Sequence, residues 1–189
     1  MAILKIARMG HPVLAGIASP VRDPTAPEIK RLVADMIETM RDANGAGLAA
    51  PQVHVPLRVV VFQAPAGRAE SDLSESEVFD HTAPLTVLIN PAIEVVDATG
   101  EGGWEGCLSV PRMRGWVERP RHIRYTGYDT DGKRIVRTAK GFHARVVQHE
   151  CDHIEGILYP HRMRDLSKLI FESEIHHWLD KRGSEKAAE

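Results

Sequence analysis

The sequence has little of what several common protein classes require. Only two of its 189 residues are cysteines, which is too few for the disulfide framework of a small secreted domain. Lysine and arginine together number 24 against 26 aspartates and glutamates, so the formal net charge is -2. The basic surface that attracts phosphate backbones is therefore missing. We expect no stable binding of nucleic acid.

Long apolar runs are also absent. No segment approaches the roughly 18 consecutive apolar residues that a transmembrane helix needs. The apolar stretch within residues 1–11 is too short and too interrupted for a secretory signal. These absences predict a soluble, intracellular protein that does not bind membranes.

The remaining composition is that of a globular domain. Hydrophobic residues make up 43% of the chain and charged residues 26%, which is typical of a folded soluble domain. A chain of this length buries enough surface to form a core and a pocket without disulfides. We expect one domain over residues 1–189, with 184–189 as a flexible polar tail.

Hydrophobic spacing predicts a helix near each end of the chain. Residues 25–44 open with a capping-box pattern from Thr25 to Glu28, continue with apolar residues at helical spacing, and end at Asn44-Gly45. Residues 165–182 show similar spacing before Gly183 and predict a C-terminal helix.

Strand signals lie between these helices. Short β-branched runs predict strands at 57–62 and 85–90, and Asp131-Gly132 predicts a hairpin turn between 123–125 and 135–136. The polar stretch 64–84 is typical of a surface insertion. Because strands come in runs rather than alternating with helices, we predict an α+β fold, with antiparallel sheets packed around a central helix that follows Gly141.

That central helix contains the pattern H-E-x-x-H. His149 and His153 lie one turn apart, about 40° from each other around the helix axis, so both side chains reach the same cation. Cys151 points to the opposite side and is expected to be a buried, apolar thiol. The pattern alone occurs often by chance, and the chain has 10 histidines.

A catalytic divalent metal usually has three protein ligands and a water. The extended zinc-protease pattern fails, because Tyr159 stands where its last histidine belongs. A protease with Glu172 or Glu174 as third ligand stays open, as does a metal-stabilised binding module without turnover. Cys107 is the better third ligand, because its glycine-flanked turn would leave a thiolate accessible.

Three blocks of sequence resemble the motifs of the peptide deformylases. They are Gly45-Ala46-Gly47-Leu48-Ala49-Ala50-Pro51-Gln52, Glu105-Gly106-Cys107-Leu108-Ser109 and Gln148-His149-Glu150-Cys151-Asp152-His153. Residues 7–14 are similar to that family's usual opening, so the resemblance covers most of the chain. The polar stretch before Leu85 is similar to variants with an enlarged loop.

The resemblance implies a metal-dependent hydrolase that removes the formyl group from the N-terminal formyl-methionine of new polypeptides and releases formate. It implies that Cys107, His149 and His153 hold the metal, which makes hydroxide available to attack the formyl carbon. Glu150 would act as general base and then as acid. The side-chain amide of Gln52 and the backbone N–H of Leu108 would stabilise the oxyanion.

Other roles follow from the same motifs. Gly45, Ala46 and Gly47 would contact the substrate backbone, although turn geometry explains the glycines equally well. The methionine side chain would occupy an apolar pocket formed by the face of residues 142–154. Glu105 is expected to orient a ligand histidine, whereas Asp152 is expected to be a solvated helix carboxylate.

Ligand chemistry does not select the metal. Two imidazoles and a thiolate suit zinc, iron, cobalt and nickel. The resemblance implies one Fe2+ in the cell, with Zn2+, Ni2+ or Co2+ in purified protein. It also implies nascent formyl-methionyl polypeptides as partners and transient ribosome contact. Formyl-methionine initiation, without an evident transit segment, favours the bacterial cytoplasm.

Overall fold

The structure is a computed structural model that describes residues 2–66 and 75–179. The described helices are α1 (Pro27–Asp42), α2 (Glu75–His81) and α3 (Gly141–Ile154). The described strands are β1 (Gly47–Ala49), β2 (Val59–Ala64), β3 (Ala83–Cys107), β4 (Val110–Tyr128), β5 (Arg134–Lys140) and β6 (Leu169–Phe171). None of the described helices has the length and apolar character to cross a membrane.

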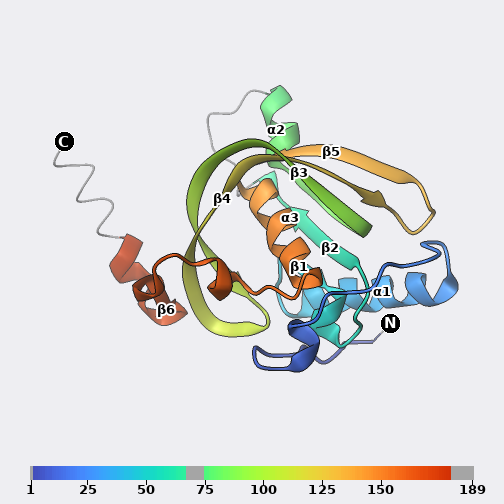
Figure 1. Cartoon of the computed structure of the whole chain (residues 1–189), viewed down its shortest axis with the longest axis horizontal. Coiled ribbons are helices and arrows are strands. Elements are labelled where there is room, and N and C mark those ends of the chain that lie inside the picture. The colour runs from blue at the N-terminus through green and yellow to red at the C-terminus, as the bar shows by residue number, and fades with distance from the viewer. Residues whose placement is uncertain (1, 67–74, 180–189) are drawn as a thin grey trace.

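The strands form a bent antiparallel sheet around one helix. Its order is β1-β2-β3-β4-β5, and β6 pairs with β4. The long strands β3 and β4 arch over α3, which lies in the middle of the molecule (Figure 1). The predicted α+β class is confirmed, and in the described residues the strands join into one sheet.

Helix α3 is buried along nearly its whole length. Gly141, at φ 53°, lets the chain turn from β5 into the helix, and Gly156, at φ 74°, follows its end. Val147, Cys151 and Ile154 belong to the main core cluster. Cys151 is 9% exposed, and burial raises the pKa of its thiol. The prediction that Cys151 is a buried, apolar thiol is confirmed.

Helix α1 covers the other side of β1 and β2 (Figure 1). The predicted capping box is wrong, because the N-cap is Ala26 and no side chain caps the helix. The Thr25 hydroxyl instead donates to Asp23 Oδ1 at 2.7 Å. Pro27 occupies the first turn, where its fixed φ and missing N–H are tolerated.

The predicted C-terminal helix is wrong over residues 165–175. A 3-10 turn at Leu166–Lys168 leads into β6, a second 3-10 turn follows at Glu172–Glu174, and helical geometry is described only for 176–179. Pairing of β6 with Met113–Gly115 of β4 supplies the backbone hydrogen bonds that a helix would otherwise make. Residues 180–182 and the predicted tail 184–189 lie outside the described residues.

The middle of the chain matches the predictions more closely. The predicted hairpin is confirmed, although Ile123 pairs with Ala139 rather than with residues 135–136. Within the polar stretch 64–84, the structure describes the end of β2, helix α2 and the start of β3. Residues 67–74 of the expected insertion lie outside the described residues.

A buried ionic network joins β3, β4 and α3. Arg119 on β4 donates from Nε to Glu105 Oε1 at 2.6 Å and from Nη1 to Asp152 Oδ2 at 2.8 Å. Arg145 Nη1 also donates to Glu105 Oε1 at 2.8 Å. Burial opposes ionisation of Glu105, yet Arg119 and His149 hold the pKa of its carboxyl well below the usual range.

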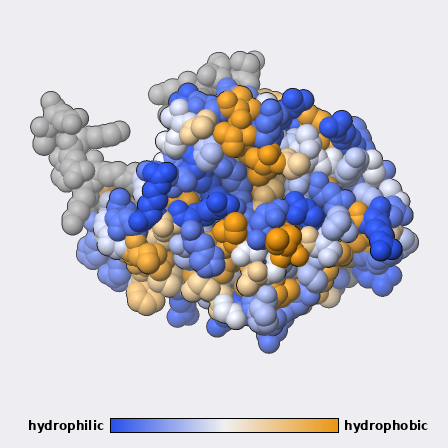
Figure 2. Space-filling model, viewed as in Figure 1, coloured by the Kyte–Doolittle hydropathy of each residue, from blue (hydrophilic) through white to orange (hydrophobic). Residues whose placement is uncertain are grey.

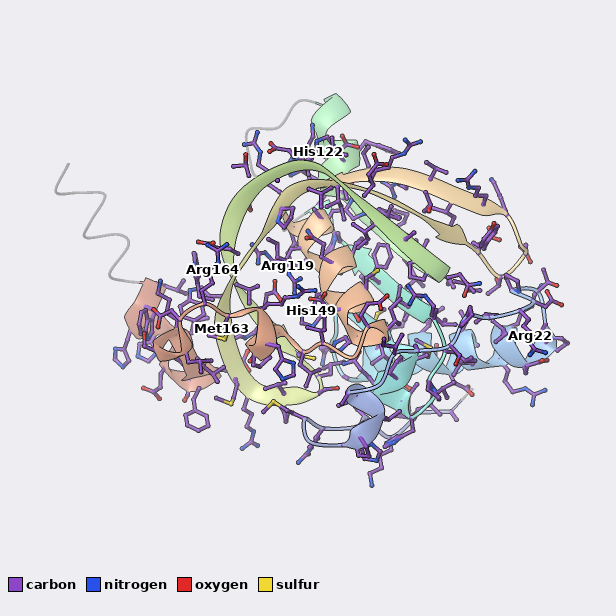
Figure 3. The ribbon with its side chains drawn as sticks, viewed as in Figure 1. Arg22, Arg119, His122, His149, Met163 and Arg164 are labelled. Carbon is purple, nitrogen blue, oxygen red and sulfur yellow. The ribbon has the colours of Figure 1, made fainter. Side chains whose placement is uncertain are left out.

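Asp152 does not fit the expectation of a solvated carboxylate. Its residue is 7% exposed, and it accepts from Arg162 as well as from Arg119. The guanidinium groups offset the cost of burying the carboxylate. Figure 3 shows Arg119 beside His149 in the interior, between β4 and α3.

The network predicts a large difference between two neighbouring arginines. Arg119→Met leaves the carboxylates of Glu105 and Asp152 buried without this partner, so we expect the free energy of unfolding to fall by about 3–5 kcal/mol. Arg121→Met removes a side chain that is 59% exposed and pairs with Asp97, and should change stability much less. Chemical denaturation of both variants tests this, and equal losses would contradict it.

A second buried group predicts a pH dependence of stability. His143 is fully buried, and its Nδ1 donates to the Asp80 carbonyl at 2.8 Å, which leaves Nε2 to accept from the Tyr125 hydroxyl at 3.2 Å. Burial lowers the pKa of His143 from 6.5 to about 4. Between these values the unfolded chain binds a proton that the folded protein does not.

The free energy of unfolding should therefore fall as the pH drops from about 6.5 towards 4, by up to about 3 kcal/mol from this residue. His143→Gln removes the titrating group, so its stability curve should be flatter over this range. Urea titrations at several pH values compare the two proteins. Parallel curves for both would show that His143 does not contribute.

Candidate active site

Three side chains that are far apart in the sequence meet at one point. Cys107 lies at the end of β3, and His149 and His153 lie on α3. One ligand atom from each of them falls within 4.8 Å of the others. Cys107 Sγ is 3.3 Å from His153 Nε2, and the ring centroids of His149 and His153 are 5.0 Å apart. These three residues form the candidate metal centre.

Local structure explains how each ligand is presented. The two histidines share a face because they lie four residues apart on a helix. Cys107 stands where β3 turns into β4, paired with Val110, and the arch of the sheet carries this turn onto α3. Helical spacing predicts the first feature, whereas the second requires contacts between distant parts of the chain.

The alternative third ligands are not in this cluster. Glu172 lies near the cavity but accepts from Arg114 Nε at 2.9 Å. Glu174 lies near His177 on the surface. Tyr159, at the position of the protease pattern's last histidine, is buried and stacks on the His149 ring at 6.2 Å between centroids.

Glu105 orients one of the histidines, as the sequence led us to expect. His149 Nδ1 lies 2.9 Å from Glu105 Oε2, and because a carboxylate only accepts, Nδ1 carries the hydrogen. Nε2 is then the ring nitrogen that remains to bind a cation. Burial disfavours the imidazolium form, but Cys107 and Glu105 together raise the pKa of His149 above its ordinary value.

Glu150 presents a buried carboxyl group to the same cavity. Its residue is 5% exposed, and its Oε2 atom is buried without a hydrogen-bond partner among the described residues. A Cβ on Gly47 would overlap this carboxyl group, so a larger residue there would have to displace the Glu150 side chain. Burial raises the pKa of Glu150 to about 7, against the opposing effect of His149. The group is therefore suited to exchanging a proton near neutral pH.

Gln52 lies beside the thiol rather than on the surface. Its residue is 2% exposed. Its Oε1 accepts from the Ala49 N–H at 2.8 Å, and its Nε2 donates to Ser109 Oγ at 3.1 Å and lies 3.5 Å from Cys107 Sγ. Leu108 follows Cys107 in the turn and lines the same cavity. Gln52 is therefore a buried residue of the candidate site.

A cavity of about 490 Å³ connects these groups. Gly45, Ala46 and Gly47 form one wall, the β3–β4 turn forms the facing wall, and Phe142, Arg145, Val146, His149 and Glu150 of α3 form the base. His153 lies deeper, at 1% exposure. In the described residues β1 pairs only with β2, so its other edge is available for an extended peptide.

The donor set fits a divalent metal. One thiolate and two imidazoles suit a borderline cation, and the buried Glu150 Oε2 is a further unpartnered oxygen at the site.

The structure also reveals two residues to which sequence reasoning assigned no role. Arg145 contacts Glu105, and Ser109 contacts Gln52. Helical spacing carries no signal for the partner of Arg145. Ser109 lies within a recognised motif, but only the fold shows what its hydroxyl contacts.

Comparison with known proteins shows the family of this chain. The profile of the polypeptide deformylase family matches residues 3–169. The chain is 52% identical over 175 residues to peptide deformylase 2 of Bordetella bronchiseptica, covering 93% of this chain and 96% of the relative. It is 50% identical over 169 residues to peptide deformylase 2 of Ralstonia nicotianae, covering 89% and 92%.

Solved structures show the same similarity. The peptide deformylase of Ehrlichia chaffeensis superposes with a TM-score of 0.80 at 29% identity, covering 97% of this chain and 99% of that one. An actinonin-bound class I type b peptide deformylase from Acinetobacter baumannii superposes with a TM-score of 0.72 at 33% identity, covering 86% and 99%. With the family profile spanning most of its length, this chain belongs to the polypeptide deformylase family.

Proposed function

We propose that the protein hydrolyses the formamide of N-terminal formyl-methionine on newly made polypeptides, giving formate and a free amine. The observation that carries this proposal is the meeting of Cys107, His149 and His153 beside the buried Glu150 carboxyl group, in a chain of the deformylase family. We further propose that residues 1–189 form one catalytic domain.

The three clustered side chains are the proposed ligands of one divalent metal. A metal bound there would polarise the formyl carbonyl and make water nucleophilic near neutral pH. We propose Fe2+ as the metal in the cell, with Zn2+, Ni2+ or Co2+ in purified protein, because the ligand set accepts all four.

Glu150 is the proposed proton carrier. Its unpartnered Oε2 would accept a proton from the attacking water and then donate it to the leaving amine nitrogen. The pKa of about 7 in its buried setting suits both steps. A group that must first accept and then release a proton works best when its pKa is near the working pH.

Two donors would stabilise the negative charge that develops on the formyl oxygen. The Gln52 Nε2 amide lies beside Cys107, and the Leu108 backbone N–H belongs to the next residue of the same turn. A donor in such a position contributes about 3 kcal/mol to lowering the barrier.

The open edge near β1 is the proposed substrate track. An extended peptide would hydrogen-bond to the backbone of Gly45, Ala46 and Gly47. The methionine side chain would lie against Phe142 and Val146 and the aliphatic part of Arg145, which line the cavity. Because this substrate is a newly made polypeptide, we also predict transient contact with the ribosome and a location in the bacterial cytoplasm.

The proposal predicts distinct results for two site residues. In anaerobic assays with formyl-Met-Ala-Ser, the wild-type protein should release formate. Cys107→Ala should lose both metal and turnover, because it removes one of three ligands. Glu150→Ala should retain metal but lose at least about a thousandfold in kcat, because no other group replaces its proton transfer.

Elemental analysis beside the formate assay measures both quantities. Cys151→Ala is the matched control, because this cysteine faces the core, and it should keep metal and turnover. Near-wild-type turnover by Glu150→Ala would refute its role, and full metal content in Cys107→Ala would refute the ligand set. Cleavage of blocked internal peptides without formate release would instead favour the protease alternative.

A further inference from the structure

A second hollow adjoins the candidate active site. This N-terminal groove, of about 850 Å³, lies between residues 3–8 and the C-terminal end of α1. Ala43, Leu108 and Pro111 line both the groove and the active-site cavity. The two hollows therefore share a wall, and a peptide that passed over these three residues would reach the groove.

The site geometry gives the direction in which a bound peptide would run. Gly47 faces the Glu150 carboxyl group, and Gly45 faces Leu108, where an added Cβ would lie 3.0 Å from Cδ1. Ala43 lies further along, at the shared wall. A peptide whose formyl end is near Glu150 would follow this order, and at about 3.3 Å per residue its first four residues would span it.

The groove offers both apolar and charged surface. Ile3, Leu4 and Ile6 contribute apolar surface. Lys5 and Arg8 provide positive charge, and Asp42 is the one carboxylate among the described residues that line the groove. The N-terminal segment is held in place, because the Leu4 N–H donates to Thr39 Oγ1 at 2.9 Å and the Ala7 N–H to the Gln52 carbonyl at 2.7 Å. Figure 2 shows that apolar and charged residues are interspersed on the face of the molecule that it presents.

We propose that the N-terminal groove binds the fifth and later residues of the polypeptide substrate and prefers apolar and acidic side chains there. This inference rests on the proposed function, because it extends the same substrate track. Two observations favour the later part of the substrate as the occupant of the groove. The groove shares lining residues with the active-site cavity, and its charged lining residues are mainly basic.

The test compares three formylated peptides that share Met-Ala-Ser at their start. One ends after Ser, and two nine-residue peptides carry leucines with either aspartates or lysines at positions 5–8. For the wild-type protein, kcat/KM for the acidic nonapeptide should exceed that for the basic nonapeptide by a factor of at least about three. In Lys5→Glu/Arg8→Glu this preference should invert, because the charge at the groove reverses.

The control is Arg22→Glu/Arg31→Glu, which makes the same charge change outside the groove. Figure 3 shows Arg22 at the edge of the molecule, away from His149. This variant should keep the wild-type ratio between the nonapeptides. A matching shift in the control would overturn the groove as the cause, and equal kcat/KM for all three peptides would overturn the proposal.

Binding of the unformylated, fluorescein-labelled peptides separates this inference from the proposed function. Anisotropy should show tighter binding of the acidic nonapeptide whether or not formate is released. If longer peptides bind more tightly but no formate is released, the proposed function is wrong and the groove is not. If binding does not depend on peptide length, the groove proposal is wrong.

An independent observation concerns the Gln52 amide. The Ala49 N–H is only a donor, so the atom facing it must be the amide oxygen, and Nε2 must face Ser109 and Cys107. Ser109 is fully buried. Its hydroxyl oxygen accepts one amide hydrogen, and the other is left for the side of the cavity that contains the thiol.

The backbone holds the same two residues together. The N-terminal segment donates from the Ala7 N–H to the Gln52 carbonyl at 2.7 Å and from the Met9 N–H to the Ser109 carbonyl at 2.8 Å. The Gln52 loop and the Ser109 turn are therefore fixed relative to each other before substrate binds. The Ser109 hydroxyl completes this arrangement at the side-chain level.

We infer that Ser109 is a positioning residue that acts on the reaction through Gln52. Ser109→Ala should lower kcat about tenfold with KM changed less than twofold, because the amide loses its orientation but not its presence. Gln52→Ala should lower kcat about a hundredfold. The double variant should be no slower than Gln52→Ala, because Ser109 has nothing left to position.

Ser109→Thr distinguishes positioning from packing. It keeps the hydroxyl but adds a methyl group at a fully buried position, so a packing role makes it worse than alanine and a positioning role makes it better. The inference would be overturned if the losses in kcat of the two single variants multiply in the double variant. It would also be overturned if Ser109→Thr is slower than Ser109→Ala. Full kcat in Gln52→Ala would overturn the role of Gln52 and this inference together.

Discussion

The buried carboxylate of Glu105 is the contact on which the rest of the site depends. It accepts hydrogen bonds from Arg119, Arg145 and His149, and therefore joins β3, β4 and α3 at one point. Cys107 lies two residues further along the same strand. A single ion-paired group thus sets the strand that carries the thiol against the helix that carries the imidazoles.

Helix α3 serves the core and the site with opposite faces. Val147, Cys151 and Ile154 pack into the sheet, while His149 and Glu150 reach the cavity. Because both faces of the helix are buried, each charged group on it costs folding free energy unless it has a partner. The arginines of β4 and α3 neutralise Glu105 and Asp152. Glu150 has no arginine partner among the described residues, and burial raises its pKa.

The cavity is shaped by the absence of side chains as much as by their presence. Gly47 leaves room for the Glu150 carboxyl group, and Gly45 lies close to Leu108. The close approach of these elements leaves the edge of β1 beside the predicted metal ligands. The same wall leads past Ala43 towards the N-terminal segment, so the first residues of the chain border the site although they carry none of its predicted chemistry.

Local pattern alone determined the pairing of His149 with His153, the burial of Cys151 and the β4–β5 hairpin, because helical period and turn chemistry act between near neighbours in the sequence. The glycine-flanked turn around Cys107 and the motif resemblance together indicated the third ligand. The tertiary structure decided what depends on distant partners: Asp152 is buried because Arg119 and Arg162 reach it, and residues 169–171 form a strand because β4 offers an edge. Backbone and charged groups take whichever partner the fold brings within reach, and that partner is not encoded in their immediate neighbours.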